Sequence, residues 1–149
     1  MVANPPTDMP RITPHIFYDD IAAAMDWLVE AFGFEVRLRM TDKQGLVVHG
    51  ELEVADSLVM LGLAGEKKDW TSPQTHNGHI NGRLYIFVDD VDAHYKRAVS
   101  AGAKINVELA EQFWGDRCYE CIDPEGHHWK FAQHLWDVDN RNLKRPEDM

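Results

Sequence analysis

The stretch Phe17-Tyr18-Asp19-Asp20-Ile21-Ala22-Ala23 decides the fold, because a close copy, Phe87-Val88-Asp89-Asp90-Val91-Asp92-Ala93, follows later in the chain. In both places an apolar, β-prone run ends at an acidic pair, and an amphipathic segment comes next. An aspartate at that point can cap the first amides of a helix and complement its dipole. The repetition therefore predicts two copies of one supersecondary unit.

The same spacing aligns residues 56–61 with residues 126–131, where a turn precedes an apolar run in both copies. Alternation and helical periodicity then predict one strand, one helix and three strands in each copy. The expected elements are residues 12–18, 22–32, 34–40, 46–54 and 58–63, followed by 82–88, 91–101, 103–107, 117–122 and 127–133. The predicted fold class is α+β, with two βαβββ modules in tandem. Each module is a curved four-stranded sheet covered by a helix, and the two are expected to enclose a cavity.

The predicted domain spans residues 12–134, with module one at 12–64, a linker at 65–81 and module two at 82–134. Residues 1–11 are rich in proline and are expected to form a flexible N-terminal arm, and residues 135–149 form a C-terminal tail. The linker is polar except for Trp70. This tryptophan is expected either to anchor the linker to the core or to lie on a flap over a ligand.

Charge and composition exclude several classes of protein. The 149 residues include 15 Lys and Arg against 25 Asp and Glu, and the formal net charge of −10 repels nucleic acid and anionic membranes. No apolar run approaches the roughly 18–20 residues that a membrane-spanning helix needs, and the N-terminus lacks the pattern of a secretory signal. We therefore predict a cytoplasmic protein with neither a nucleic-acid nor a membrane partner.

Cys118 and Cys121 form a CxxC pattern, which is typical of redox pairs and zinc knuckles. Alternation along residues 117–122 predicts a strand, however, and a strand points positions three apart to opposite faces. We therefore do not expect a redox or metal-binding pair here. No serine lies in a G-x-S-x-G pattern, so a nucleophilic triad is not indicated either.

At this point the sequence resembles the vicinal oxygen chelate superfamily, which comprises glyoxalases, extradiol dioxygenases, fosfomycin-modifying enzymes and bleomycin-resistance proteins. The resemblance covers residues 12–133. It is carried by the acidic pairs, by the helix ends at residues 31–34 and 101–103, and by the run Asp123-Pro124-Glu125-Gly126-His127-His128-Trp129. Residues 113–117 look most like the bleomycin-resistance and PhnB-like branch. The resemblance implies a small-molecule ligand and a homodimer.

In the metalloenzymes of this family, the first and last strands of each module supply the metal ligands. Aligned with those positions, this chain has Thr13, Met60, Arg83 and Lys130. Methionine is a weak ligand for zinc, nickel, manganese or iron, and Arg and Lys bring positive charge toward a cation. We therefore predict no metal and no cofactor at these positions.

Strand alternation points further side chains toward the same cavity, and long loops add two tryptophans. The predicted ligand-binding set is Thr13, His15, Phe17, His49, Met60, Trp70, Arg83, Tyr85, Phe87, Trp114, His128 and Lys130. Its aromatic members either fill the core or form a stacking pocket for a flat ligand. Its two cations, Arg83 and Lys130, either form salt bridges with Glu51 or Glu120 or clamp an anionic ligand.

These observations favour a metal-free binding protein that sequesters an aromatic or anionic small molecule. The alternative is an enzyme of the lyase, isomerase or dioxygenase type. It would use a displaced metal site at His15, His49 and Glu51, or acid–base catalysis by His15 or Glu51. The remaining histidines are not expected to bind metal, because His76 and His79 lie in the polar linker and His134 is expected beyond the last strand.

Overall fold

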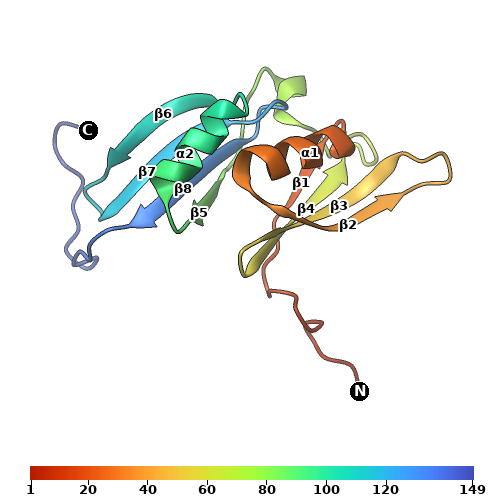
Figure 1. Cartoon of the computed structure of the whole chain (residues 1–149), viewed down its shortest axis with the longest axis horizontal. Coiled ribbons are helices and arrows are strands. Elements are labelled where there is room, and N and C mark those ends of the chain that lie inside the picture. The colour runs from red at the N-terminus through yellow and green to blue at the C-terminus, as the bar shows by residue number, and fades with distance from the viewer. The chain divides into compact units, whose positions relative to one another are not determined.

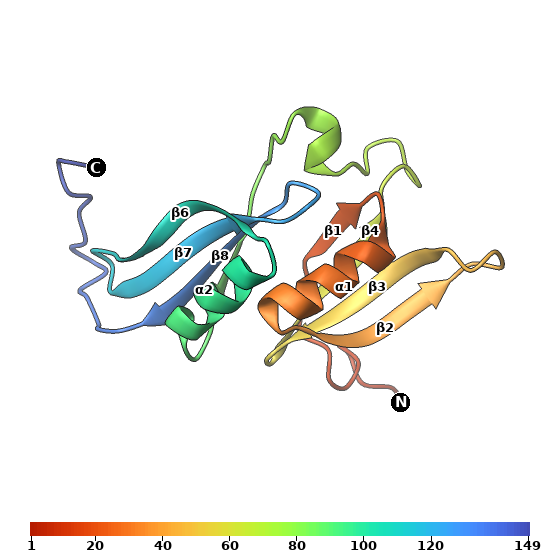
Figure 2. The same cartoon turned by 45° about the horizontal axis from the view of Figure 1, so that its top comes forward.

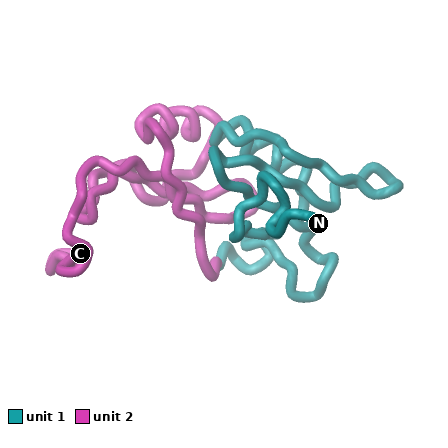
Figure 3. Tube along the Cα trace, turned by 90° about the horizontal axis from the view of Figure 1, so that it is seen from below, with its two compact units in different colours: residues 1–79 teal, residues 80–149 magenta.

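A computed structural model describes all 149 residues of the chain. The chain divides into two compact units, unit 1 at Met1–His79 and unit 2 at Ile80–Met149 (Figure 3). Most of the predicted linker therefore belongs to unit 1. No helix is long and apolar enough to cross a membrane.

Unit 1 contains one helix packed on a four-stranded sheet (Figures 1 and 2). The strands lie in the order β1-β4-β3-β2, with β1 parallel to β4 and the other pairs antiparallel. The elements are β1 (His15–Tyr18), α1 (Ile21–Phe32), β2 (Glu35–Thr41), β3 (Val47–Val54), β4 (Ser57–Leu63) and a short 3-10 helix, η1 (Pro73–His76).

The repeated acidic pair starts α1 as predicted. Asp20 is the N-cap, and its carboxylate accepts a hydrogen bond of 3.0 Å from the amide of Ala23. Gly33 ends the helix in the left-handed conformation, at φ 73°. The buried stripe of α1 includes Met25, whose Sδ atom would lie 2.4 Å from a Cβ placed on Gly50. A larger residue at this point of β3 would therefore require the Met25 side chain to move.

Unit 2 repeats the arrangement with the order β5-β8-β7-β6, and β5 is parallel to β8. Asp90 caps α2 through a hydrogen bond of 3.0 Å from the amide of Ala93. Trp129, Phe131 and Tyr119 are fully buried in its core. The elements are β5 (Leu84–Phe87), α2 (Val91–Ser100), β6 (Lys104–Glu111), β7 (Asp116–Ile122) and β8 (His128–His134).

The two βαβββ units confirm the predicted α+β fold. The cavity expected between the modules stays a prediction. Three local expectations were wrong. β6 continues to Glu111, the linker contains η1, and His134 is the last residue of β8 instead of lying beyond it. The last strand extends because His134 pairs with Asp116, the first residue of β7.

One face of each sheet has no helix on it, and strand register decides which side chains lie there. In unit 1, His15 pairs with Met60, and Met60 pairs with Glu51. Gly50, next to Glu51, faces α1, so this row lies on the opposite face. We call it the open face of unit 1.

In unit 2, Tyr85 and Glu120 both pair with Lys130. Their neighbour Phe131 faces α2, since its ring centroid lies 4.0 Å from that of His94. The row of Tyr85, Lys130 and Glu120 therefore forms the open face of unit 2.

Candidate ligand-binding faces

Four of the predicted site residues meet on the open face of unit 1. The ring of Trp70 stacks on Phe17, with centroids 4.6 Å apart and planes inclined by 18°. The imidazole of His15 lies edge-on to Trp70, with ring centroids 5.5 Å apart. The centroid of the His49 imidazole lies 5.7 Å from that of His15. We call these four residues the unit 1 aromatic cluster. Gly62 lies beneath it, because a Cβ there would come within 2.7 Å of His15 Nε2 and 2.9 Å of Phe17 Cδ1.

The linker holds Trp70 in place through the repeated acidic stretch. The Asp19 carboxylate accepts hydrogen bonds from the Ser72 hydroxyl at 2.7 Å and from the Gln74 amide. The backbone amide of Gly65 donates to the carbonyl of Trp70 at 2.8 Å. The ring of Trp70 therefore packs on its own unit, and a role over a ligand stays a prediction.

Glu51 is the buried carboxylate beside the unit 1 aromatic cluster, and both of its oxygens are engaged. Oε2 lies 3.0 Å from Nε2 of His49, and Oε1 lies 3.4 Å from Nε of Arg37. No group of three His, Cys, Asp or Glu side chains in the chain is arranged to hold a metal ion. The arrangement of His15, His49 and Glu51 therefore gives no support to a displaced metal site.

The surroundings of His15 disfavour its protonated form. Burial, followed by the neighbouring imidazole of His49, lowers the pKa of His15 against the opposing charge of Glu66. Thr13 lies just before β1, and Met60 is half-buried in β4 between His15 and Glu51. Neither carries a strong ligand group for a metal.

Glu120 forms the first polar centre on the open face of unit 2. Its Oε2 forms an ion pair with Arg83 Nη1 at 3.0 Å, while Oε1 lies 2.7 Å from His128 Nδ1 and 3.1 Å from Asn106 Nδ2. Burial by itself would raise the pKa of Glu120, but Asn106, His128 and Arg83 together outweigh it and lower that pKa. For Arg83, the structure therefore shows the salt bridge that the sequence left as one of two alternatives.

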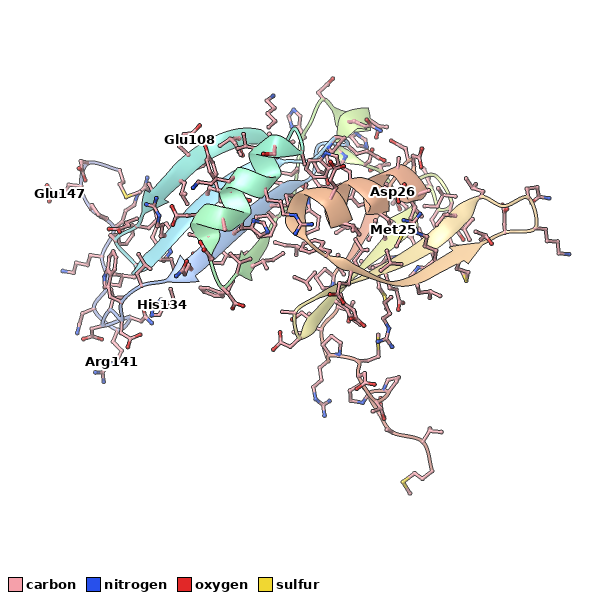
Figure 4. The ribbon with its side chains drawn as sticks, viewed as in Figure 1. Met25, Asp26, Glu108, His134, Arg141 and Glu147 are labelled. Atoms are coloured by element: carbon pink, nitrogen blue, oxygen red, sulfur yellow. The ribbon has the colours of Figure 1, made fainter.

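Asp116 forms the second polar centre, which sequence reasoning missed by placing this residue in a loop. Its Oδ2 accepts a hydrogen bond of 2.5 Å from the Tyr85 hydroxyl, whose oxygen accepts one of 3.0 Å from Trp114 Nε1. Its Oδ1 lies 2.7 Å from His134 Nδ1, and His134 Nε2 lies 2.8 Å from Asp137 (Figure 4 labels His134). The sequence does hold a signal for this contact. In an antiparallel pairing of the last two strands, Asp116 and His134 are equally far from the turn that joins the strands and therefore lie opposite each other.

Lys130 makes cation–π contacts with two aromatic rings, those of Trp114 and Tyr85. Its Nζ atom is 5.2 Å from the ring centroid of Trp114 and 5.8 Å from that of Tyr85. The residue is only 7% exposed. No carboxylate oxygen lies within 4.0 Å of Nζ, although Lys130 pairs with Glu120 in the strand register. The salt bridge considered for Lys130 is therefore absent.

Two further aromatic groups extend the open face of unit 2. The ring of Phe87 is 60% exposed and lies 5.5 Å from the ring of Tyr85, which is itself 40% exposed. Of the predicted unit 2 residues, Arg83, Tyr85, Trp114, His128 and Lys130 are joined by the two polar centres and the cation–π contacts, and Phe87 borders them.

The two cysteines do not supply reactive thiolates. Both are free and buried, and they occupy positions three apart in β7. Burial raises the pKa of the Cys118 thiol despite the nearby charge of Lys130, and burial followed by Asp123 raises the pKa of Cys121 to about 12. A buried thiol that stays protonated at neutral pH is a poor nucleophile and a poor metal ligand.

Comparison with known proteins matches most of the chain to one protein family. The model of the Glyoxalase/Bleomycin resistance protein/Dioxygenase superfamily matches residues 9–131. An uncharacterized protein of Mycobacterium bovis is 34% identical over 134 residues, which cover 87% of this chain and 86% of that protein.

Solved structures show the same fold. TioX from Micromonospora sp. ML1 superposes with a TM-score of 0.69 at 33% identity, covering 85% of this chain and 99% of TioX. TnmS3, an antibiotic binding protein from Streptomyces sp. CB03234, superposes with a TM-score of 0.63 at 22% identity, covering 82% of this chain and 93% of TnmS3.

Proposed function

Because this chain belongs to the Glyoxalase/Bleomycin resistance protein/Dioxygenase superfamily, we propose that it uses the open faces to bind and sequester an aromatic or anionic small molecule without a metal ion. TnmS3 binds an antibiotic on a similar fold. At 22% identity that likeness concerns the fold alone, so the proposal depends on the side chains of this chain.

The observation that carries the proposal is the pair of exposed aromatic rings of Phe87 and Tyr85 on the open face of unit 2. Neighbouring exposed aromatic side chains offer apolar area that a ligand can cover. The hydroxyl of Tyr85 is held by Asp116, which fixes the ring for stacking against a flat ligand. The unit 1 aromatic cluster offers a second stacking surface.

The chemistry of the four family ligand positions supports binding without a metal. Thr13, Met60, Arg83 and Lys130 supply no carboxylate and no imidazole. We expect elemental analysis of purified, untagged protein to find no stoichiometric zinc, nickel, manganese or iron. One equivalent of such a metal, lost on His15→Ala or His49→Ala, would contradict the proposal.

Calorimetry with a panel of planar aromatic compounds tests the binding proposal directly, in the presence and absence of a chelator. Phe87→Ala is expected to weaken binding, whereas Val99→Ala, which removes an exposed apolar side chain from α2, serves as the matched control. Equal affinities for Phe87→Ala and Val99→Ala would show that the open face of unit 2 is not the binding surface.

A second candidate is a metal-free lyase or isomerase, and the state of His15 favours it. An imidazole with a lowered pKa is neutral near pH 7 and can accept a proton, and the pair of His49 and Glu51 lies beside it. A substrate screen with His15→Gln decides between the candidates. Turnover that His15→Gln abolishes, with ligand affinity unchanged, would favour the enzyme.

The proposal includes a cytoplasmic protein that forms a homodimer. The cytoplasmic location is proposed from the composition of the chain. The homodimer is proposed from the resemblance of its motifs to the family. Light scattering during size-exclusion chromatography tests the homodimer, and a mass equal to one 17.1 kDa chain would contradict it.

A further inference from the structure

Lys130 is a buried cation without an anionic partner. The residue is 93% buried, since 7% of it is exposed, and no carboxylate oxygen reaches its Nζ atom within 4.0 Å. Burying a charge is costly unless it is paired and hydrogen-bonded. Its aromatic neighbours, Trp114 and Tyr85, supply only part of that compensation. The ammonium group of Lys130 therefore has room for an anionic partner that the chain itself does not supply.

Both carboxylates of this open face are already bonded to groups other than Lys130. Glu120 uses Oε2 for Arg83 and Oε1 for His128 and Asn106. Asp116 uses Oδ2 for Tyr85 and Oδ1 for His134. Arg83, His128, Asn106, Tyr85 and His134 thus engage the two carboxylates, and neither carboxylate forms an ion pair with the Lys130 ammonium group.

We propose that Lys130 is the receptor for a single carboxylate or phenolate group on an aromatic ligand of this protein. This inference rests on the proposed function and adds the chemical class of the ligand. The ammonium group has three donors and a compact charge, which suits one anionic group. The rings of Trp114 and Tyr85 flank it, so an aromatic body attached to that group can stack beside the charge.

The charge of the open face favours a ligand with one negative charge over a ligand with two. Arg83 is the second cation of this face, and its guanidinium is already paired with Glu120. Glu120 and Asp116 would repel additional negative charge from a phosphate dianion, and only one cation remains to offset it. A carboxylate or phenolate therefore suits the face better than a phosphate monoester.

The test compares 2-naphthoate with 2-naphthamide, which have nearly the same shape and differ in charge. Wild-type protein is expected to bind 2-naphthoate more tightly. Lys130→Met removes the charge while keeping much of the side-chain length, and it should weaken 2-naphthoate about tenfold to hundredfold, the range for hydrogen bonds to charged groups. Its effect on 2-naphthamide should stay below about threefold. Lys104→Met, an exposed lysine of β6, makes the same charge change and should alter neither affinity.

Calorimetry gives these affinities, and each result has a distinct meaning. If Lys130→Met weakens both probes equally, or wild type does not prefer 2-naphthoate, the inference is wrong while the proposed function stands. If neither probe binds at millimolar concentration, both are wrong. Tighter binding of 2-naphthyl phosphate than of 2-naphthoate would overturn the preference for a monoanion.

A second measurement on the wild-type protein covers the case in which Lys130→Met fails to fold. The side-chain Cε and Hε nuclear magnetic resonance signals of Lys130 should shift on addition of 2-naphthoate and much less with 2-naphthamide. Those of Lys104 should not shift with either. Unchanged Lys130 signals at saturating 2-naphthoate would overturn the inference.

Discussion

Trp70 stacks on Phe17 with ring centroids 4.6 Å apart, which attaches the long linker to the open face of unit 1. A stacked aromatic pair contributes about 0.5–1.5 kcal/mol beyond its buried area. We therefore expect Trp70→Ala to lower the free energy of unfolding by about 1–2 kcal/mol in denaturant titrations. Trp136→Ala, which removes a more exposed tryptophan from the C-terminal tail, is the control. Equal effects of the two variants would contradict an anchoring role for Trp70.

Arg83→Met leaves the buried carboxylate of Glu120 without its cation. Breaking a fully buried pair costs roughly 3–5 kcal/mol. The Arg83 side chain is 44% exposed, so solvent screening reduces the expected loss to about 1–2 kcal/mol. Adding Glu120→Gln to Arg83→Met should recover part of that loss. A double variant less stable than Arg83→Met would show that Glu120 matters chiefly through His128 and Asn106.

The loss of stability caused by Arg83→Met should be larger at neutral pH than in acid. The folded-state pKa of Glu120 lies below its ordinary value, so its stabilising contribution is present above the unfolded pKa. It is lost as the pH falls through the folded pKa. Melting temperatures of wild type and Arg83→Met should therefore differ most at neutral pH and converge in acid. A difference that is constant from pH 7 down to pH 3 would contradict this prediction.

The effect of replacing His134 on stability should have the opposite dependence on pH. Hydrogen bonds to Asp116 and then Asp137 raise the pKa of His134. A raised folded-state pKa stabilises the protein fully below the unfolded value and loses that stabilisation as the pH rises through the folded value. His134→Gln should therefore lower the melting temperature more at pH 5.5 than at pH 8.5. His79→Gln, which replaces an exposed histidine of the linker, is the control and should show no such trend.

Gly115 precedes the Asp116 network and has φ +97°, and a Cβ there would lie 2.0 Å from the carbonyl oxygen of Trp136. Gly115→Ala should therefore combine backbone strain with a steric clash. Gly45→Ala separates the two effects, because Gly45 has φ +87° and nothing within 4 Å of its Cβ position. We expect Gly45→Ala to cost about 1 kcal/mol and Gly115→Ala clearly more. Equal losses in denaturant titrations would show that the tail moves aside.

The sequence was sufficient for the fold because its main signals are local. Asp20 and Asp90 each cap a helix in the structure as the repeat predicts. Strand parity also placed Arg83, Tyr85 and Lys130 on one face. These features depend on backbone geometry over a few residues.

The sequence alone could not predict which partner each charged side chain would bind. Parity brings Arg83, Lys130 and Glu120 together, but side-chain reach and competing hydrogen bonds decide that Arg83 takes the carboxylate. Asp116 was assigned to a loop because the strand pattern becomes regular only after it. Its role depends on register with His134, which is a contact between distant parts of the chain.

The parallel pairing of β1 with β4 has a consequence for how unit 1 acquires its structure. His15 pairs with Met60 in the strand register, so β1 has no sheet partner until the distant strand β4 is in place. The hairpin of β2 and β3 joins neighbouring segments and pays a smaller loop-closure entropy. During refolding, amide protons of β2 and β3 should therefore become protected from exchange before those of β1.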